Sequence, residues 1–309
     1  MREFHPGPAP KGFKKDFESF LFNTIAHRKT QSKTGWKEFH LINKSKRKIL
    51  ASVSFHVDGQ VARSPLKAPF GSYEFSETIS QRKLSKFIKA VDHSLKEAGV
   101  KKVEIINHPK IYNTQHPIVI FSLIHQGYSP FQCDVNTHIK VDKLPLVRKM
   151  NKGKRKQFRH CMKVGLRFKK LPNSKRNDLY DFIARCRAER NQSLSLTKKE
   201  LNKIIIALPK NFILVGVYNE KELIAGSVCV LINKKILYTF YSAHLKKYDS
   251  LSPLTFLLSN LYEWCLKNGF NLLDMGTSSI NGKPNFNLVN FKLRVGGTMS
   301  PKFSFRKTL

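Results

Sequence analysis

Residues 254–277, LTFLLSNLYEWCLKNGFNLLDMGT, contain the pattern that decides the fold. Apolar residues recur four, three and four positions apart and end at Gly269, which is typical of one buried helix face followed by a left-handed stop. The apolar run LLDM after the glycine predicts a β-strand that carries Asp274. The stretch therefore predicts a helix that packs on a sheet and leads directly into one of its strands.

The same pattern occurs earlier in the chain, starting at Leu84 instead of Leu254, an offset of 170 residues. Residues 84–107, LSKFIKAVDHSLKEAGVKKVEIIN, have the same apolar spacing, a glycine at the matching position and a strand in which Glu104 falls on Asp274. The same offset continues without a gap. Phe121 matches Phe291, Leu123 matches Leu293 and Gly127 matches Gly297. This period is too long for a solenoid. The sequence therefore predicts two tandem domains of one ancestral type.

The order of predicted elements is clearest in the second copy. It runs as a strand at 166–170, helices at 176–190 and 197–208, three antiparallel strands (FILVGVY, LIAGSVCVLI and KILYTFYSA), the helix and strand of the repeat, a helix near 286–294 and a closing strand near 298–306. Thr197 and Glu200 predict a capping box at the start of the second helix. The first copy is similar but degenerate at its front, with strands expected near 36–43, 48–56 and 60–64.

The sharpest change of composition lies between the two copies. Residues 143–176 hold fourteen Lys or Arg and no Asp or Glu, and the stretch 146–164 predicts a basic helix with one glycine break. We therefore predict a first domain at 1–145 and a second at 146–309. The cations of this helix that we expect to bind polyanions are Lys154, Arg155, Lys156 and Arg159.

The whole chain is strongly basic. Its 56 Lys and Arg outnumber its 21 Asp and Glu and give a formal net charge of +35, while 41% hydrophobic and 11% aromatic residues are typical of a globular protein. Such a field attracts RNA, DNA, nucleotide cofactors and anionic membrane surfaces. A composition that simply favours lysine is the plainer explanation. The predicted partners are a phosphate-bearing substrate, with tRNA and an anionic membrane surface as further candidates, and no obligate protein partner.

Cysteine and histidine usage argues against disulfides and metals. The five cysteines are widely spaced, and an odd count without a framework predicts reduced thiols. No two of the eleven histidines are three or four positions apart, as one helical metal-binding face requires, so we predict no metal site. The start of the chain has no apolar run of a signal peptide, and no stretch approaches the roughly 20 apolar residues of a membrane span. We therefore expect a cytoplasmic protein.

The element order resembles that of the Gcn5-related N-acetyltransferase (GNAT) superfamily, and two such domains joined by a basic helix resemble the Fem family of aminoacyl-tRNA-dependent peptidyltransferases. Four segments carry the resemblance: KVGLRFKKL, YSAHLKKYDSLSPLTFLL, KNGFNLLDMGTSS and NLVNFKLRVGG. The first resembles the family's entry into its second domain, and the last its Phe-Lys motif before a glycine turn. The resemblance implies an α/β protein of two tandem GNAT-like domains, each a mixed, mostly antiparallel sheet flanked by helices.

The resemblance also implies the transfer of an activated acyl or aminoacyl group to an amine. The chain has no room for the helical arm with which some Fem proteins contact tRNA, and its KKYDSLSP connection has none of the glycines of the coenzyme A phosphate loop. The donor therefore stays open between acyl-coenzyme A and aminoacyl-tRNA, and the acceptor between a cell-wall precursor, an amino sugar, a lipid amine and a peptide. The alternatives are a noncatalytic nucleic-acid-binding protein on this fold and a peripheral-membrane lipid N-acyltransferase.

Three candidate catalytic residues lie in the second domain. Lys292 follows Phe291 in the Phe-Lys motif, where the family's lysine is thought to stabilise charge on the transferred carbonyl, and the matching residue of the first copy is Ser122. Asp274, at the carboxyl end of a strand, is expected to accept a proton or orient the amine, or else to form a structural ion pair. Tyr241 is a candidate proton donor, with aromatic packing as the alternative.

Further residues are candidates for holding substrate or donor. Ser242 ends the strand beside the same site, and Ser252 begins a helix whose N–H groups suit a phosphate or a carbonyl oxygen. Arg190 is expected to bind an anion or to pair with Glu189. In the first domain the stretch RSPLKAPFGSYEF is either a substrate-lining loop or an ordinary turn, and its candidate residues are Arg63, Gly71 and Ser72; Phe291 completes the set.

Overall fold

The computed structural model describes residues 2–280 and 282–309, which form two compact units. Unit 1 comprises Met1–Val135, Asn281–Lys283 and Ser300–Leu309, and unit 2 comprises Asn136–Ile280 and Pro284–Met299. The main segment of unit 1 therefore ends ten residues before the boundary predicted at 145, and the last residues of the chain return to this unit. The sequence repeat predicts the order of elements along the chain but not the sheet that each strand joins.

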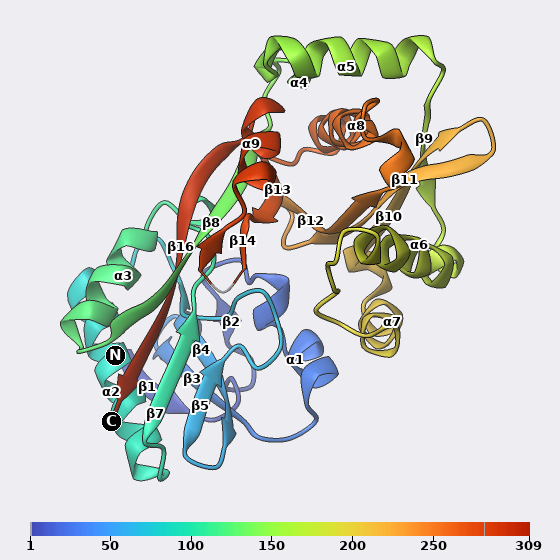
Figure 1. The fold of residues 1–309 in the computed structure, drawn as a ribbon. Helices are drawn as coiled ribbons and strands as arrows, with labels where there is room; N and C mark the ends of the chain where they lie inside the picture. Colours follow the sequence, from blue (N-terminus) through green and yellow to red (C-terminus); the bar gives the residue numbers. More distant parts are fainter. Residues whose placement is uncertain (1, 281) are drawn as a thin grey trace. The chain divides into compact units, whose positions relative to one another are not determined.

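Unit 1 is a mixed sheet covered on one face by two helices (Figure 1). Its elements are β1 (Arg2–Pro6), β2 (Lys14–Lys15), α1 (Ile25–Gln31), β3 (Trp36–Asn43), β4 (Lys48–Asp58), β5 (Val61–Ser64), β6 (Glu74–Phe75), α2 (Gln81–Glu97), β7 (Lys102–Ile106), α3 (His116–His125), the first part of β8 (Ser129–Lys140) and most of β16 (Thr298–Thr308). The strands are ordered β1-β3-β4-β5-β7-β16, with β5 and β7 parallel. The apolar stripe of α2 that begins at Leu84 is buried against this sheet, as predicted.

Unit 2 has the same architecture. Its elements are α4 (Leu146–Lys149), α5 (Lys152–Lys163), β9 (Arg167–Leu171), α6 (Arg176–Ala188), α7 (Lys198–Ala207), β10 (Phe212–Asn219), β11 (Glu222–Leu231), β12 (Ile236–His244), α8 (Pro253–Lys267), β13 (Leu272–Thr277), β14 (Ser279–Ile280), β15 (Lys283–Pro284) and α9 (Phe286–Arg294). The strands are ordered β9-β10-β11-β12-β13, followed by the end of β8. The basic stretch after Pro145 forms two helices rather than one, because the chain becomes extended at Met150 and Asn151.

The two copies match element by element. The order β1-β3-β4-β5-β7 of unit 1 corresponds to β9-β10-β11-β12-β13 of unit 2. The parallel pair of β5 with β7 lies at the same place as that of β12 with β13. The helices α2 and α8 lie at the positions of the repeat, as do α3 and α9. The predicted fold class, two tandem α/β domains with mixed sheets, is therefore confirmed.

The last strand of each copy belongs to the sheet of the other copy. Strand β16, which closes the second copy, pairs with β7 through Ser304–Thr308, whereas the end of β8 pairs with β13 through Asn136–Lys140. Both strands are long, twelve residues for β8 and eleven for β16, so each runs across the boundary between the units. Unit 2 therefore receives side chains that the first copy of the repeat encodes.

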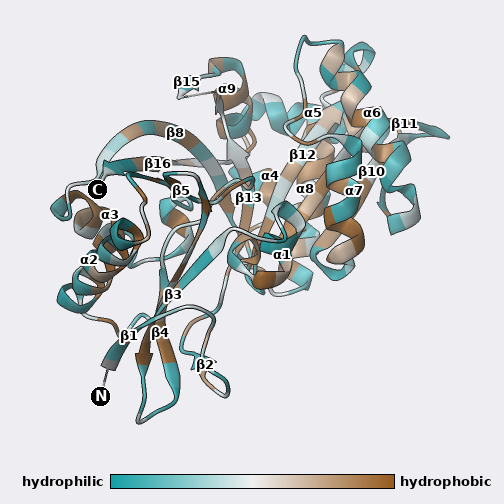
Figure 2. Ribbon diagram, turned by 90° about the horizontal axis from the view of Figure 1, so that it is seen from below, coloured by the Kyte–Doolittle hydropathy of each residue, from teal (hydrophilic) through white to brown (hydrophobic). Residues whose placement is uncertain are grey.

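Helices cover both faces of the unit 2 sheet. On one face α8 packs on β10 to β13 and is itself covered by α5, and its leucines join the main hydrophobic core of the unit. Figure 2 shows hydrophobic residues concentrated on α8 and on strand β10. On the other face α6 packs on β11 and β12, where Gly226 lets Leu179 approach, because a Cβ at this glycine would lie 2.5 Å from the Leu179 side chain. The predicted capping box of Thr197 and Glu200 begins α7.

Candidate active site

Three polar side chains form a row across neighbouring strands of unit 2. Tyr238 on β12 pairs with Asp274 on β13, and Asp274 pairs in turn with His138 on β8. Residues that pair directly in a sheet project from the same face, so the three side chains lie side by side. The order of strands therefore places a carboxyl group between a phenol and an imidazole.

The two parallel strands separate immediately after this row. The pairing of β12 with β13 ends at Tyr238 and Asp274, although β12 continues to His244 and β13 to Thr277. Gly276 has a φ of +72° and donates its N–H to Asp274 Oδ1 at 2.7 Å, so the backbone turns back on the carboxylate. Ligand sites in α/β folds lie at the carboxyl ends of parallel strands. Here the carboxyl ends of β12 and β13 are no longer paired, because the backbone of β13 turns at Gly276.

Lys292 reaches the same point from α9. This helix begins at Asn285, whose side chain accepts the N–H of Leu288 at 3.0 Å. Two turns later the Lys292 ammonium donates to the carbonyl of Gly276 at 2.9 Å and to that of Thr277 at 3.0 Å, and the residue is only 6% exposed. An ammonium has three N–H groups, so one remains after these two bonds.

Burial changes the protonation of Lys292. Desolvation lowers the pKa of the ammonium to about 7, an effect that Asp274 opposes and that the charge of Arg187 reinforces. Both protonation states are therefore populated near neutral pH. In the protonated state Lys292 is a fixed cation in a largely dry environment, which is the arrangement that stabilises an oxyanion.

Asp274 is held rigidly in the row. It is 1% exposed, and its Oδ1 atom accepts hydrogen bonds from Asn136 Nδ2 at 3.0 Å and from the Gly276 N–H. Asn136 and His138 both come from β8, the strand contributed by the first copy. Burial lowers the pKa of His138, which keeps its ring neutral at neutral pH. Neither residue was predicted from the sequence, because no local pattern indicates that their strand joins the second sheet.

Tyr241, the predicted proton donor, is used elsewhere. Its hydroxyl lies 2.7 Å from Ser195 Oγ and accepts the N–H of Leu196 at 2.9 Å, so it fixes the segment between α6 and α7. The tyrosine in the row is Tyr238, which the sequence analysis did not single out. Ser242 likewise bonds to the neighbouring strand, with its Oγ 2.8 Å from Ser227 Oγ.

The start of α8 is held by the basic helix. Ser252 does not cap α8 with its side chain, because its backbone is left-handed, with a φ of 54°, and its Oγ accepts a hydrogen bond from Lys154 at 2.8 Å. The Lys154 ammonium also lies 4.6 Å from the ring centroid of Phe291. Of the four predicted polyanion-binding cations, Lys154 is thus engaged within unit 2, Arg155 is partly buried, and Lys156 and Arg159 are exposed.

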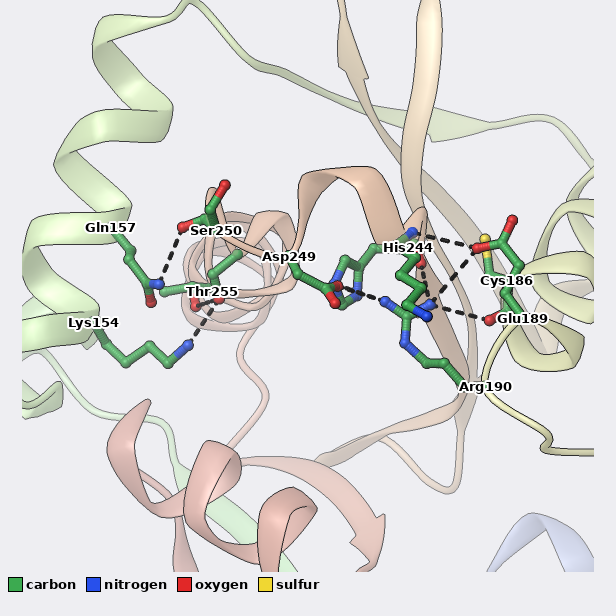
Figure 3. A network of polar contacts seen from close by, with 11 residues as sticks. Lys154, Gln157, Cys186, Glu189, Arg190, His244, Asp249, Ser250 and Thr255 are labelled. Atoms are coloured by element: carbon green, nitrogen blue, oxygen red, sulfur yellow. Dashed lines mark hydrogen bonds and ion pairs between the residues drawn. The ribbon is translucent and has the colours of Figure 1, made fainter.

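Arg190 ties α6 to the connection between β12 and α8 (Figure 3). Its guanidinium donates to Asp249 Oδ1 at 2.5 Å and to the carbonyls of Cys186 and His244, both at 3.1 Å. From the other side, Gln157 of α5 donates to the carbonyl of Ser250 at 3.2 Å. These contacts fix the conformation of the glycine-free connection and occupy the Arg190 guanidinium. The sequence predicted that Arg190 binds an anion or pairs with Glu189, and the pair is present, with Nη1 4.0 Å from Glu189 Oε2.

The three candidates of unit 1 form structural contacts. Arg63 Nε lies 3.1 Å from Glu104 Oε2, directly across from it in the parallel pair. Gly71 donates its N–H to Ile106 at 2.9 Å, and a Cβ there would lie 2.6 Å from Ser64 Oγ. Ser72 is 2% exposed and donates its N–H to Ser64 Oγ at 3.0 Å. These contacts match an ordinary, tightly packed turn.

The first copy has no counterpart of the lysine. Ser122, which matches Lys292, is fully buried, and its Oγ has no hydrogen-bond partner among the residues that the structure describes. Glu104, which matches Asp274, is paired with Arg63 and Lys102. The combination of a buried cation and a buried carboxylate at the end of the central parallel pair is thus specific to unit 2.

Within residues 2–280 and 282–309, no group of three or more His, Cys, Asp or Glu is arranged to hold a metal ion. Nor does that part of the chain contain a helix with the length and apolar character to cross a membrane.

Comparison of the fold with solved structures identifies its type. The fold is similar to that of FemX, with a TM-score of 0.72, 12% identity and coverage of 95% of this chain and 94% of that one. It is also similar to a tandem GNAT protein of the clavulanic acid biosynthesis pathway (TM-score 0.55, 9% identity, coverage of 100% and 98%) and to L-PGS from Bacillus licheniformis (TM-score 0.55, 15% identity, coverage of 83% and 80%). No protein-family model matches the sequence, and neither does any curated protein. The chain therefore has a Fem-like tandem GNAT fold.

Proposed function

We propose that unit 2 transfers an activated acyl or aminoacyl group to an amine. The observation that carries this proposal is the buried Lys292 ammonium, fixed by the carbonyls of Gly276 and Thr277 and left with one further N–H. A preorganised cationic donor of this kind stabilises negative charge on a carbonyl oxygen. The likeness of the fold to FemX and to a tandem GNAT protein supports the same class of reaction.

The residues of the site have separate tasks in this reaction. The amine nitrogen attacks the donor carbonyl, so a C–N bond forms while one electron pair of the C=O bond moves to oxygen, where the remaining N–H of Lys292 binds it. Asp274 orients the amine and takes up the proton that the nitrogen loses. The oxyanion then collapses and the C–S or C–O bond to the carrier breaks. The proton held by Asp274 passes to the leaving sulfur or oxygen, so the carrier leaves as a thiol or hydroxyl and Asp274 is ionised again.

The donor is an acyl-coenzyme A or an aminoacyl-tRNA. Both carry phosphates, which agrees with the net charge of +35. The connection of residues 245–252 has no glycine, and Arg190 and Gln157 hold it from two sides. Donor phosphates would meet this fixed segment and the first turn of α8, whose N–H groups and helix dipole attract anions.

The partners follow from the same charge. Lys156 and Arg159 are exposed on α5 and suit a phosphate-bearing substrate, tRNA or an anionic membrane surface. We propose a cytoplasmic location, where charged tRNA and coenzyme A thioesters are both available, and no obligate protein partner. The acceptor is an amine of a cell-wall precursor, an amino sugar, a lipid or a peptide.

A direct test supplies the purified protein with each donor and a panel of amines. One series contains mixed acyl-coenzyme A thioesters and the other charged tRNA, and mass spectrometry detects new amides. Lys292→Ala should lower the rate about 100- to 1,000-fold, the usual cost of one oxyanion donor, and Lys292→Arg should restore only part of it. Equal rates in the wild type and Lys292→Ala would contradict the proposal.

A second candidate is a noncatalytic nucleic-acid-binding protein. The exposed cations of α5 favour it, because basic side chains on one helix neutralise phosphates. The buried Lys292 argues against this alternative, because a surface that binds nucleic acid uses exposed cations and gains nothing from a buried one. Salt-dependent RNA binding combined with no amide formation from either donor would favour this alternative.

A further inference from the structure

One positively charged side chain near the site, Arg187, has no acidic partner among the described residues. Arg187 lies on α6 one turn after Ile183, which is fully buried against the sheet, so it continues the sheet-facing stripe of the helix. Within the described part of the chain its guanidinium donates one hydrogen bond, from Nη1 to Gln192 Oε1 at 3.3 Å, and pairs with no carboxylate. Arg187 is half-buried, and even partial desolvation of a guanidinium without a counter-charge costs free energy.

Two further groups beside Arg187 have unused hydrogen-bonding capacity. The Tyr238 hydroxyl makes no hydrogen bond within residues 2–280 and 282–309, and burial holds its pKa well above the usual range, so it stays a donor. His138 is 2% exposed, and its Nδ1 atom has no partner there either. Both flank Asp274 in the row across β12, β13 and β8.

The three groups belong to one cluster. Helix α6, which carries Arg187, packs on β12, the strand of Tyr238 and Tyr241. The charge of Arg187 accordingly favours ionisation of both phenols and disfavours protonation of Lys292. Two cations, a phenol and a neutral imidazole thus surround a single carboxylate, whose Oδ1 already accepts two hydrogen bonds. The cluster offers more donors than the protein itself uses.

We propose that Arg187, Tyr238 and His138 bind an acidic group of the substrate, a carboxylate or a phosphate, next to the reacting carbonyl. The planar fork of a guanidinium fits two oxygens of either group. The phenol donates to the same oxyanion, and the imidazole does so through whichever nitrogen carries the proton. A bound anion also provides the counter-charge that Arg187 lacks.

The plainest alternative is that Arg187 only stabilises the end of α6. A cation in the last turn of a helix interacts favourably with the helix dipole. Arg185 stands in the same turn but is exposed, with its guanidinium 6.0 Å from the Phe182 ring. Arg185→Gln therefore removes the same charge from the same helix end and is the matched control for Arg187→Gln.

The test measures anion binding without turnover. The intact protein is labelled with ¹³C at lysine Cε, and Lys292 is identified as the resonance that titrates near pH 7 and is missing from Lys292→Arg. Phosphate and acetate are titrated in separate arms at constant ionic strength. In the wild type and in Arg185→Gln, the anion that binds should raise the pKa of Lys292, because it adds negative charge beside the ammonium.

Arg187→Gln should bind that anion about 10- to 100-fold more weakly, the usual effect of losing a charge-assisted hydrogen bond. In the absence of anion its Lys292 should titrate at a higher pH than in the wild type, because a repelling cation has been removed. Tyr238→Phe should weaken binding to a smaller extent. The arm with the tighter binding identifies the acidic group as phosphate or carboxylate.

Equal binding by the wild type and Arg187→Gln would overturn the proposal, and so would an equal loss in Arg187→Gln and Arg185→Gln, which indicates a general field effect. The inference uses the proposed function only to name the bound group as part of a substrate. If anion binding depends on Arg187 but no acyl transfer is found, the proposed function fails and the anion site stands. If acyl transfer is found but anion binding does not depend on Arg187, the anion site fails and the proposed function stands.

Discussion

Lys292 donates a 2.9 Å hydrogen bond to the carbonyl of Gly276, the residue whose own N–H is bonded to Asp274. One turn of backbone thus connects the cation and the carboxylate of the site. The positive φ of Gly276 makes this turn possible, and a Cβ at this position would lie 2.9 Å from the Tyr238 ring. The glycine therefore links all three side chains.

The first prediction concerns Gly276. Gly276→Ala should destabilise unit 2 and lower transfer activity, because alanine is strained at a φ of +72° and its methyl group would displace Tyr238. Gly165 also has a positive φ, of 71°, but a Cβ there meets no atom within 4 Å. Gly165→Ala therefore controls for backbone strain alone. Thermal unfolding and activity of both variants check the prediction, and equal losses of activity would contradict it.

The second prediction is a pH-dependent stability. The pKa of Lys292 is lowered from 10.5 to about 7 in the folded protein, so between these values the unfolded chain binds more protons. Folding stability contributed by this residue should therefore rise with pH across that window, by at most about 1.4 kcal/mol per pH unit. Denaturant unfolding of the wild type and Lys292→Met at pH 6 and pH 10 checks it. A difference in stability that does not change with pH would contradict the assigned pKa.

The third prediction follows from the exchanged strands. Phe305 is buried in the core of unit 1 and Ile139 in that of unit 2, although each comes from the other copy. Phe305→Ala should deprotect the amides of β7, and Ile139→Ala those of β13, each at a cost of about 2–5 kcal/mol. Hydrogen exchange detects which unit opens. Deprotection of β13 by Phe305→Ala would contradict the pairing.

The fourth prediction separates the cations of α5. Lys156→Gln with Arg159→Gln should weaken RNA or anionic-vesicle binding and reduce its salt dependence without lowering the melting temperature, because both side chains are exposed. Lys154→Gln should instead lower the melting temperature, because it loses its contacts with Ser252 and Phe291. Binding titrations at several salt concentrations check the first part. An unchanged affinity would mean that the charged face is merely solvated.

The sequence predicted those features that depend on local periodicity. The spacing of apolar residues around Gly99 and Gly269 correctly indicated two copies of one domain, and the Phe-Lys motif led to Lys292, which is buried beside Asp274. Both inferences rest on residues that are close together in the sequence. The apolar face of a helix and the glycine that ends it can both be recognised within one short stretch of sequence.

Features that depend on long-range pairing were not predicted. His138 and Asn136 reach Asp274 only because β8 joins the second sheet, and nothing in the local pattern of β8 specifies this partner. Tyr238 and Tyr241 are three positions apart on one strand, and only the pairing register shows that Tyr238 lies beside Asp274. Side-chain function in a sheet is decided by register, which one sequence does not reveal.

The central claim is that Lys292 acts as a cation, and the pH dependence of transfer tests it most directly. The measurement is the ratio of the wild-type rate to the Lys292→Arg rate under single-turnover conditions, because ionisation of the acceptor amine affects both proteins equally. Arginine stays protonated, whereas the pKa of Lys292 is about 7. We predict that the ratio falls as the pH rises through the pKa of Lys292, which is about 7 in the free protein and higher with an acidic substrate bound. A ratio that rises through this pKa would show that neutral Lys292 is the active form, a base rather than an oxyanion donor, and would contradict the account.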